Sequence, residues 1–178
     1  TDLFRGVIYM RLLPILVSIS IIFPAVIHVP SEQPNIQAGI MWASSGDTVL
    51  VAPGTYQNDG NNNINFYGKA IHLLSESGPE STVIDLDHEH RGFFFSSGED
   101  TTTVVEGFKI YKGRAEEYYA IGSDDEGRGG AVFIINSSPK FINCRFENND
   151  AYNDGDAVHI RSSNGPVFED CYFYENDW

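Results

Sequence analysis

The feature that most constrains this chain is a repeat in its C-terminal third. The segment GGAVFIINSSPKFINCRFENND, residues 129–150, is followed by GDAVHIRSSNGPVFEDCYFYEND, residues 155–177, and the two align with one inserted residue. The aligned apolar pairs, 26 or 27 positions apart, are Val132 and Val158, Ile134 and Ile160, Phe141 and Phe168, Cys144 and Cys171, and Phe146 and Phe173. A fixed period in this range is typical of a solenoid, in which each repeat buries its apolar face by stacking on the next.

Within each repeat, the apolar residues indicate short β-strands. Val132 and Ile134 are two positions apart, as are Cys144 and Phe146, which is the pattern of a strand with one buried face. Gly, Asn, Ser and Pro fill the gaps, as sharp turns require. Crossovers between parallel strands are right-handed in nearly all proteins. The sequence therefore predicts an all-β fold, a right-handed parallel β-helix solenoid in which the aligned apolar pairs point inward.

Weaker copies of the repeat extend upstream. In VVEGFKIYKG, the residues Val105, Phe108 and Ile110 align with Phe141, Cys144 and Phe146. The segment RGFFFSS aligns with GGAVFIINSS. The acidic, Gly-rich stretch 116–127 is predicted to be a loop that leaves the coil. Earlier still, GDTVLVAPGTY and GKAIHLLSESGPESTVIDL are strand-like runs interrupted by Gly and Pro.

A short amphipathic helix is predicted before these strands. In NIQAGIMWA, the residues Ile36, Ile40 and Ala43 lie on one helical face. Such a helix would cover the open first coil, since an uncovered solenoid end exposes core and unpaired strand edges. No comparable segment follows the last repeat, so residues 31–178 are expected to be the N-terminal part of a longer, truncated β-helix domain.

These motifs are similar to those of a known family. NIQAGIMWASSGDTVLVAPGTYQ, GKAIHLLSESGPESTVIDL and the repeated F-x-N-C-x-F-x-N-N pattern resemble the right-handed parallel β-helix proteins of the pectin-lyase-like superfamily over residues 35–177. The superfamily contains polysaccharide lyases, glycoside hydrolases, esterases, phage tailspikes and non-catalytic surface proteins. The resemblance implies an extracellular polysaccharide as the partner, but fold alone does not choose among these activities.

The first 30 residues are typical of a secretory signal peptide. Met10 and the arginine after it precede an apolar run, residues 12–29, with a small residue, Ala25, near a suitable cleavage point. Two prolines interrupt the run, which favours a signal peptide over the alternatives of a membrane anchor or a buried segment. A secreted or cell-surface protein is therefore expected, with its initiator at Met10 and no stable membrane insertion after cleavage.

The charge balance limits the partners. The net charge of −14 repels nucleic acid and anionic membranes, so neither is an expected partner. It also repels a polyanionic glycan unless a cation bridges the two. The simpler interpretation is that the carboxylates keep an extracellular monomer soluble.

Acidic loops are candidate metal sites. GSDDEG supplies Asp124 and Asp125, and NNDAYNDGD supplies Asp154 and Asp156. Hard oxygen ligands at this density suit Ca²⁺. Members of the pectin-lyase-like superfamily, which this chain resembles, use Ca²⁺ to neutralise the carboxylates of uronic acids. The alternative is that these are ordinary loops of an acidic protein. DLDHEH, residues 85–90, is either a transition-metal site or, as its non-standard spacing favours, an exposed polar turn.

Outward positions of successive coils should form two columns that could contact sugar. One contains Phe94, Phe133 and His159, with Arg161 beside it. The other consists of Lys109, Arg145 and Tyr172 beside Tyr111, Glu147 and Tyr174. Aromatic rings interleaved with hydrogen-bonding groups suit a glycan, whose CH faces stack on rings. The alternative is that the rings are cross-strand ladders that stabilise the sheets.

The two cysteines, Cys144 and Cys171, should stack in neighbouring coils with strands about 4.8 Å apart. Parallel side chains in register point the same way, which favours two buried thiols. An even number of cysteines in a secreted chain keeps a disulfide as the alternative.

No family catalytic signature is visible. His159 and Arg161 are the best basic pair for a lyase, and Asp154 and Asp156 are the nearest carboxylates for a hydrolase. Two hypotheses therefore remain open. One is a polysaccharide lyase or glycoside hydrolase, and the other is a non-catalytic adhesin or stalk whose repeats are scaffold.

Overall fold

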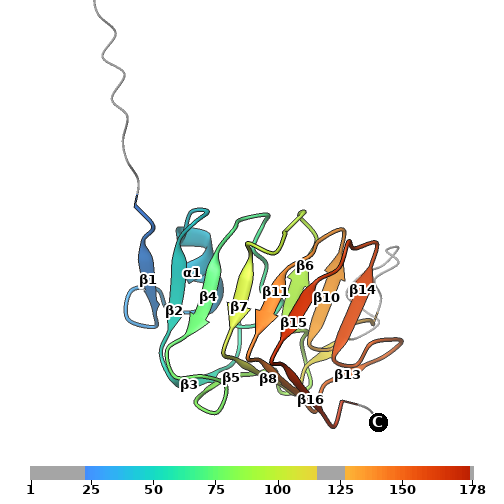
Figure 1. Ribbon diagram of the computed structural model, residues 1–178. Coiled ribbons are helices and arrows are strands. Elements are labelled where there is room, and N and C mark those ends of the chain that lie inside the picture. Colours follow the sequence, from blue (N-terminus) through green and yellow to red (C-terminus); the bar gives the residue numbers. More distant parts are fainter. Residues whose placement is uncertain (1–22, 116–126, 177–178) are drawn as a thin grey trace, which may run out of the picture.

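The computed structural model describes residues 23–115 and 127–176, and its sheets are built from parallel strands (Figure 1). Sheet A contains β1 (Val26–Val29), β2 (Thr48–Val51), β4 (His72–Ser75), β7 (Val104–Glu106), β11 (Lys140–Ile142) and β15 (Val167–Glu169), in that order. Sheet B contains β3 (Gly54–Tyr56), β5 (Thr82–Asp85), β8 (Lys109–Tyr111), β12 (Arg145–Glu147) and β16 (Tyr172–Tyr174). Sheet C contains β6 (Phe93–Phe95), β10 (Val132–Ile135) and β14 (Val158–Arg161), and β9 (Arg114–Ala115) pairs with β13 (Asp150–Ala151).

The chain visits the sheets in a fixed cycle. After β10 in sheet C it passes through β11 in sheet A, β12 in sheet B and β13, and then returns to sheet C as β14. Each circuit lays its strands beside those of the previous circuit in the same direction, which is why all three sheets are parallel. We call one circuit a coil. The arrangement is compatible with a β-helix-like solenoid.

The strand register confirms the repeat alignment. Val132 pairs with Val158 and Ile134 with Ile160 in sheet C. The alignment also holds in the other two sheets, where Phe141 pairs with Phe168 and Phe146 with Phe173. The weaker upstream copy is in register as well, since Val105 pairs with Phe141 and Ile110 with Phe146.

The core lies between the sheets. The inward residues predicted for the coil that runs from β10 to β13, all fully buried, are Val132, Ile134, Phe141, Cys144 and Phe146. Their partners in the last described coil are less protected: Ile160 is 47% exposed and Phe173 is 46% exposed. Both residues are in register with inward residues of the neighbouring coil, and the Phe173 ring stacks on that of Phe146 at 4.7 Å. They are only partly covered because they contact a described coil on one side only.

A short helix, α1 (Ile36–Trp42), lies where an amphipathic helix was predicted and packs against β1 and β2. Asn35 is its N-cap, and the Asn35 side chain accepts a hydrogen bond from the backbone of Ala38 at 2.8 Å. At the other end, the Lys69 ammonium donates to the carbonyls of Ile40, Met41 and Ala43 at 2.8–3.0 Å, which satisfies acceptors that a helix end leaves open.

One contact fixes how closely α1 packs on the first coil. A Cβ atom added to Gly39 would lie 2.8 Å from a methyl group of Val49 and 3.0 Å from a methyl group of Val29. Glycine at this position therefore allows the helix backbone to approach sheet A directly.

Strand β1 changes the predicted start of the folded region. Val26–Val29 pairs with β2 in parallel, and Ile27 and Val29 are buried. Residues 26–29, which lie inside the predicted signal peptide region 1–30, are thus part of sheet A. Most of the predicted signal peptide lies outside the described residues. Within them, no helix is long and apolar enough to cross a membrane.

Both cysteines are free thiols in the structure, as expected, but only one of the two is buried as predicted. Cys144 is buried, and burial raises the pKa of its thiol well above the ordinary value. Cys171 is half-buried, and a hydrogen bond from the Cys144 thiol lowers the pKa of Cys171. The two thiols therefore differ both in their exposure to solvent and in their pKa.

We expect the thiols to react at different rates with an aromatic disulfide reagent. Cys171 should react first in the native protein, Cys144 should react much more slowly, and both should react at once in denaturant. The Cys171→Ser variant isolates the slow phase. If no thiol titrates in denaturant without a reductant, the two residues are bonded and the assignment of free thiols is wrong.

Candidate functional site

The first predicted column lies on sheet C. Phe94, Phe133 and His159 occupy paired positions on β6, β10 and β14. The rings of Phe94 and Phe133 stack with centroids 5.7 Å apart, and the rings of Phe133 and His159 lie 5.4 Å apart. The structure therefore brings the column together. These contacts are also what a cross-strand aromatic ladder requires.

The middle ring of this column is covered. Phe133 is fully buried, and the Arg91 guanidinium lies over it at 5.1 Å and over the ring of Phe94 at 5.7 Å. Arg91 is held there by its hydrogen bonds to the carbonyls of Gly129 and Arg128, at 3.0 and 2.6 Å. A sugar cannot stack on the Phe133 ring in this arrangement. It would have to approach Phe94 or His159, which are half-buried.

Several arginines surround His159. Burial lowers the pKa of His159, and the positive charges of Arg128, Arg161 and Arg91 lower it further, against an opposing effect of Asp154. The imidazole is therefore mostly neutral at pH 7 and can accept a proton or a hydrogen bond. Arg161, in β14, is half-buried. The predicted basic pair is thus present at one end of the column.

Only two of the four predicted calcium ligands lie within the described residues. Asp124 and Asp125 lie outside the described residues. Asp154 forms an ion pair with Arg128 at 3.3 Å, and Asp156 accepts a hydrogen bond from the backbone of Ala151 at 3.2 Å. Among residues 23–115 and 127–176, no three His, Cys, Asp or Glu side chains are grouped to hold a metal.

The DLDHEH segment forms a turn. Asp87 and His88 both have positive φ angles, 51° and 58°, and the backbone of Asp87 donates to Asp85 at 3.2 Å. This geometry fits the polar-turn interpretation of the motif.

The second predicted column lies on the outer face of sheet B. Tyr172 and Tyr174 project from β16 with centroids 6.1 Å apart and ring planes within 18° of each other. They are 54% and 48% exposed. Their flat faces therefore present an accessible aromatic surface, which the first column lacks. We call these two residues the tyrosine pair.

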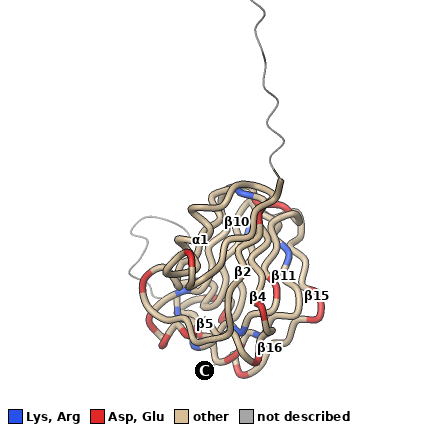
Figure 2. The backbone as a smooth tube through the Cα atoms, turned by 90° about the vertical axis from the view of Figure 1, so that its left-hand side faces the viewer, with Lys and Arg blue, Asp and Glu red and all other residues tan. Residues whose placement is uncertain are grey.

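Charged groups lie beside the tyrosine pair. Glu147 occupies the paired position next to Tyr174 and forms ion pairs with Lys109 at 3.2 Å and Arg145 at 3.9 Å. Both cations lie on the same face, in register with Tyr172. Elsewhere acidic residues are spread around the outline of the coils and outnumber the basic ones (Figure 2).

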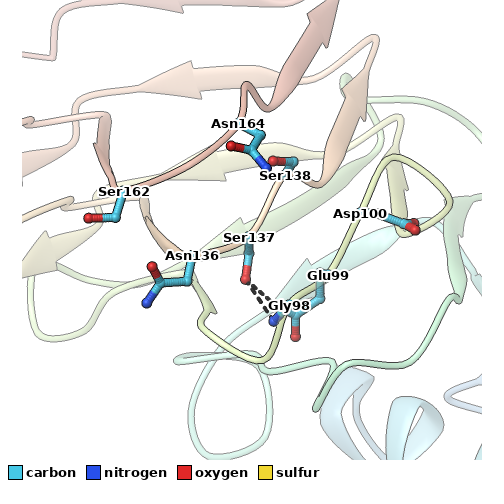
Figure 3. Close-up of a pocket in the computed structure, with 8 residues that line it drawn as sticks. All are labelled: Gly98, Glu99, Asp100, Asn136, Ser137, Ser138, Ser162 and Asn164. Carbon is cyan, nitrogen blue, oxygen red and sulfur yellow. Dashed lines mark hydrogen bonds between the residues drawn. The ribbon is translucent and has the colours of Figure 1, made fainter.

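A polar hollow lies at the corner between sheets C and A (Figure 3). Its volume is about 330 Å³, and its lining residues are Gly98, Glu99, Asp100, Asn136, Ser137, Ser138, Ser162 and Asn164. Sequence reasoning missed this corner pocket. The one sequence feature that could have indicated the pocket is the recurrence of polar residues, mainly Ser and Asn, after each strand of sheet C, but such residues are also common in ordinary turns.

Comparisons with known proteins give no match: no protein-family model, curated protein or solved structure is significantly similar to this chain.

Proposed function

We propose that this chain is a right-handed parallel β-helix protein of the pectin-lyase-like type, exported from the cell, that binds an extracellular polysaccharide on sheet B. The observation that carries the proposal is the tyrosine pair, Tyr172 and Tyr174. Two nearly parallel rings, with centroids 6.1 Å apart and about half exposed, present apolar surface to solvent on the outer face of sheet B. The CH face of a sugar ring stacks on such a surface.

The spacing on this face also supports a polymeric ligand. Neighbouring strands repeat about every 4.8 Å, close to the length of one sugar residue, so a glycan can follow successive strands. Tyr111 and Glu147 lie in the same column as Tyr174, on β8 and β12. The ion-paired groups Glu147, Lys109 and Arg145 supply hydrogen-bond partners for sugar hydroxyls.

The proposal is for binding and does not include cleavage. Glu147, the carboxylate in the tyrosine column, is held by two cations at 3.2 and 3.9 Å. A glycosidase needs a pair of carboxylates that flank the scissile bond. The second candidate function is a scaffold or adhesin stalk, which is favoured by the pairs of stacked rings that join neighbouring coils in each of the three sheets.

A glycan-array screen with and without Ca²⁺ tests binding. We expect the Tyr172→Ala/Tyr174→Ala double variant to bind at least about tenfold more weakly than the parent, since that loss corresponds to about 1.4 kcal/mol. The matched control is Tyr152→Ala, which removes a 60% exposed tyrosine from another surface.

The same screen separates the alternatives. Loss of binding in EDTA would indicate a uronate polymer bridged by Ca²⁺, whereas a neutral glycan should bind equally well without the cation. If only His159→Ala weakens binding, the site is on sheet C. If no glycan binds, the scaffold function gains and the binding proposal is wrong.

A further inference from the structure

The corner pocket is built from three stacked turns. Each follows a strand of sheet C: residues 98–100 come after β6, residues 136–138 after β10, and residues 162–164 after β14. Because the turns belong to successive coils, residues far apart in the sequence meet in one hollow (Figure 3). The pocket lies away from the tyrosine pair, which belongs to sheet B.

Glu99 forms a fixed floor. Its side chain is only 3% exposed, and its two carboxylate oxygens accept hydrogen bonds from the backbones of Gly68 and Ser97, both at 2.9 Å, and from the Ser137 hydroxyl at 2.7 Å. Ser137, 2% exposed, also accepts a hydrogen bond from the backbone of Gly98 at 3.2 Å. These bonds connect the first two turns and hold the hollow open without a ligand.

The rim of the corner pocket carries polar side chains that can form hydrogen bonds with a ligand. The side chains of Asn136, Ser162 and Asn164 are exposed, and within the described residues none of them forms a hydrogen bond. Asn136 and Ser162 have positive φ angles, 52° and 49°, which turn their side chains at the corner. Asp100 uses one carboxylate oxygen to cap Thr102.

These features define the chemistry of a ligand. The volume of about 330 Å³ is at the small end of the roughly 300–1,000 Å³ that small-molecule sites occupy. Every lining residue is polar or glycine, so the hollow suits a small molecule covered with hydroxyl groups. The carboxylates of Glu99 and Asp100 disfavour an anionic ligand.

We propose that the corner pocket binds a single neutral pyranose, with the amides of Asn136 and Asn164 as its principal hydrogen-bonding groups. The ligand class is related to that of the proposed function, but the surface is different. Either proposal can therefore fail while the other stands.

The test is a titration of the full chain, labelled with ¹⁵N, with free glucose, galactose and mannose, and with galacturonic acid as the anionic counterpart. We expect at least one neutral sugar to shift the backbone amide signals of Gly98, Ser137 and Ser162. Galacturonic acid should bind at least about tenfold more weakly, because of the two carboxylates.

Variants assign the effect to the pocket. Asn136→Gly, which keeps a residue suited to positive φ, and Asn164→Ala should each weaken binding about tenfold. The matched control is Asn143→Gly, an exposed asparagine with φ of 47° in another turn. The tyrosine double variant should bind the free sugar like the parent. The proposal is overturned if no neutral sugar shifts these signals, if galacturonic acid binds equally well, or if both asparagine variants bind like the parent.

Discussion

Replacing Phe146 with alanine should lower the free energy of unfolding by about 3–5 kcal/mol, the range for a large aromatic side chain removed from a packed core. Phe146 is fully buried. Its ring stacks on that of Phe173 at 4.7 Å and makes edge contacts with Phe141 at 5.7 Å and Phe168 at 6.1 Å. Urea denaturation followed by circular dichroism measures the change.

The matched control is Phe173→Ala in the next coil. This residue occupies the paired position in the same ladder but is 46% exposed, so its loss should be clearly smaller. A change below about 1 kcal/mol for Phe146→Ala would mean that the residue contributes little to the ladder. Equal losses for the two variants would contradict the difference in burial between their coils.

Asn149→Ala should lower the free energy of unfolding by about 2–4 kcal/mol, because more than one buried backbone group loses its partner at roughly 1–3 kcal/mol each. Asn149 is fully buried. Its side chain accepts from the backbone of Gly113 at 2.7 Å and donates to the carbonyl of Ile110 at 3.2 Å and to the side chain of Asn176 at 2.8 Å. Thermal and urea unfolding of the purified variant provide the measurement.

Asn164→Ala serves as the control for this substitution, since it removes an exposed asparagine that makes no hydrogen bond within the described residues. Its effect should stay within about 0.5 kcal/mol. If Asn149→Ala is equally mild, water replaces the lost partners and the hydrogen bonds of Asn149 are not a major source of stability.

The repeat carried most of the information about the fold. Alignment of two segments was enough to predict the pairs Phe141–Phe168 and Phe146–Phe173, since a parallel stack places equivalent residues of successive coils in register. Helix α1 was predictable because its apolar face, with Ile36 and Ile40, is a local signal. The close approach of Gly39 to Val49 was not, because it depends on two segments meeting in space.

The candidate site was harder to predict. Alternation of residues shows that Phe133 points outward, but it cannot show that Arg91, on the preceding coil, reaches across and covers the ring. Likewise, Glu99 lies in a polar turn and has the sequence context of an exposed acid, whereas Gly68 and Ser137, from other turns, donate hydrogen bonds that help to hold it in the interior. In both cases the deciding contact joins different coils.

The sequential order of the coils has a mechanical consequence. Backbone hydrogen bonds between neighbouring strands run along the stack, so a force that pulls its two ends apart acts on one coil-to-coil contact after another. At the first described coil, α1 and the Lys69 bonds to its carbonyls add contacts that the other described coils lack. Under tension, such a stack should therefore open in steps of a single coil, and the coil that carries α1 should resist longer than its neighbours.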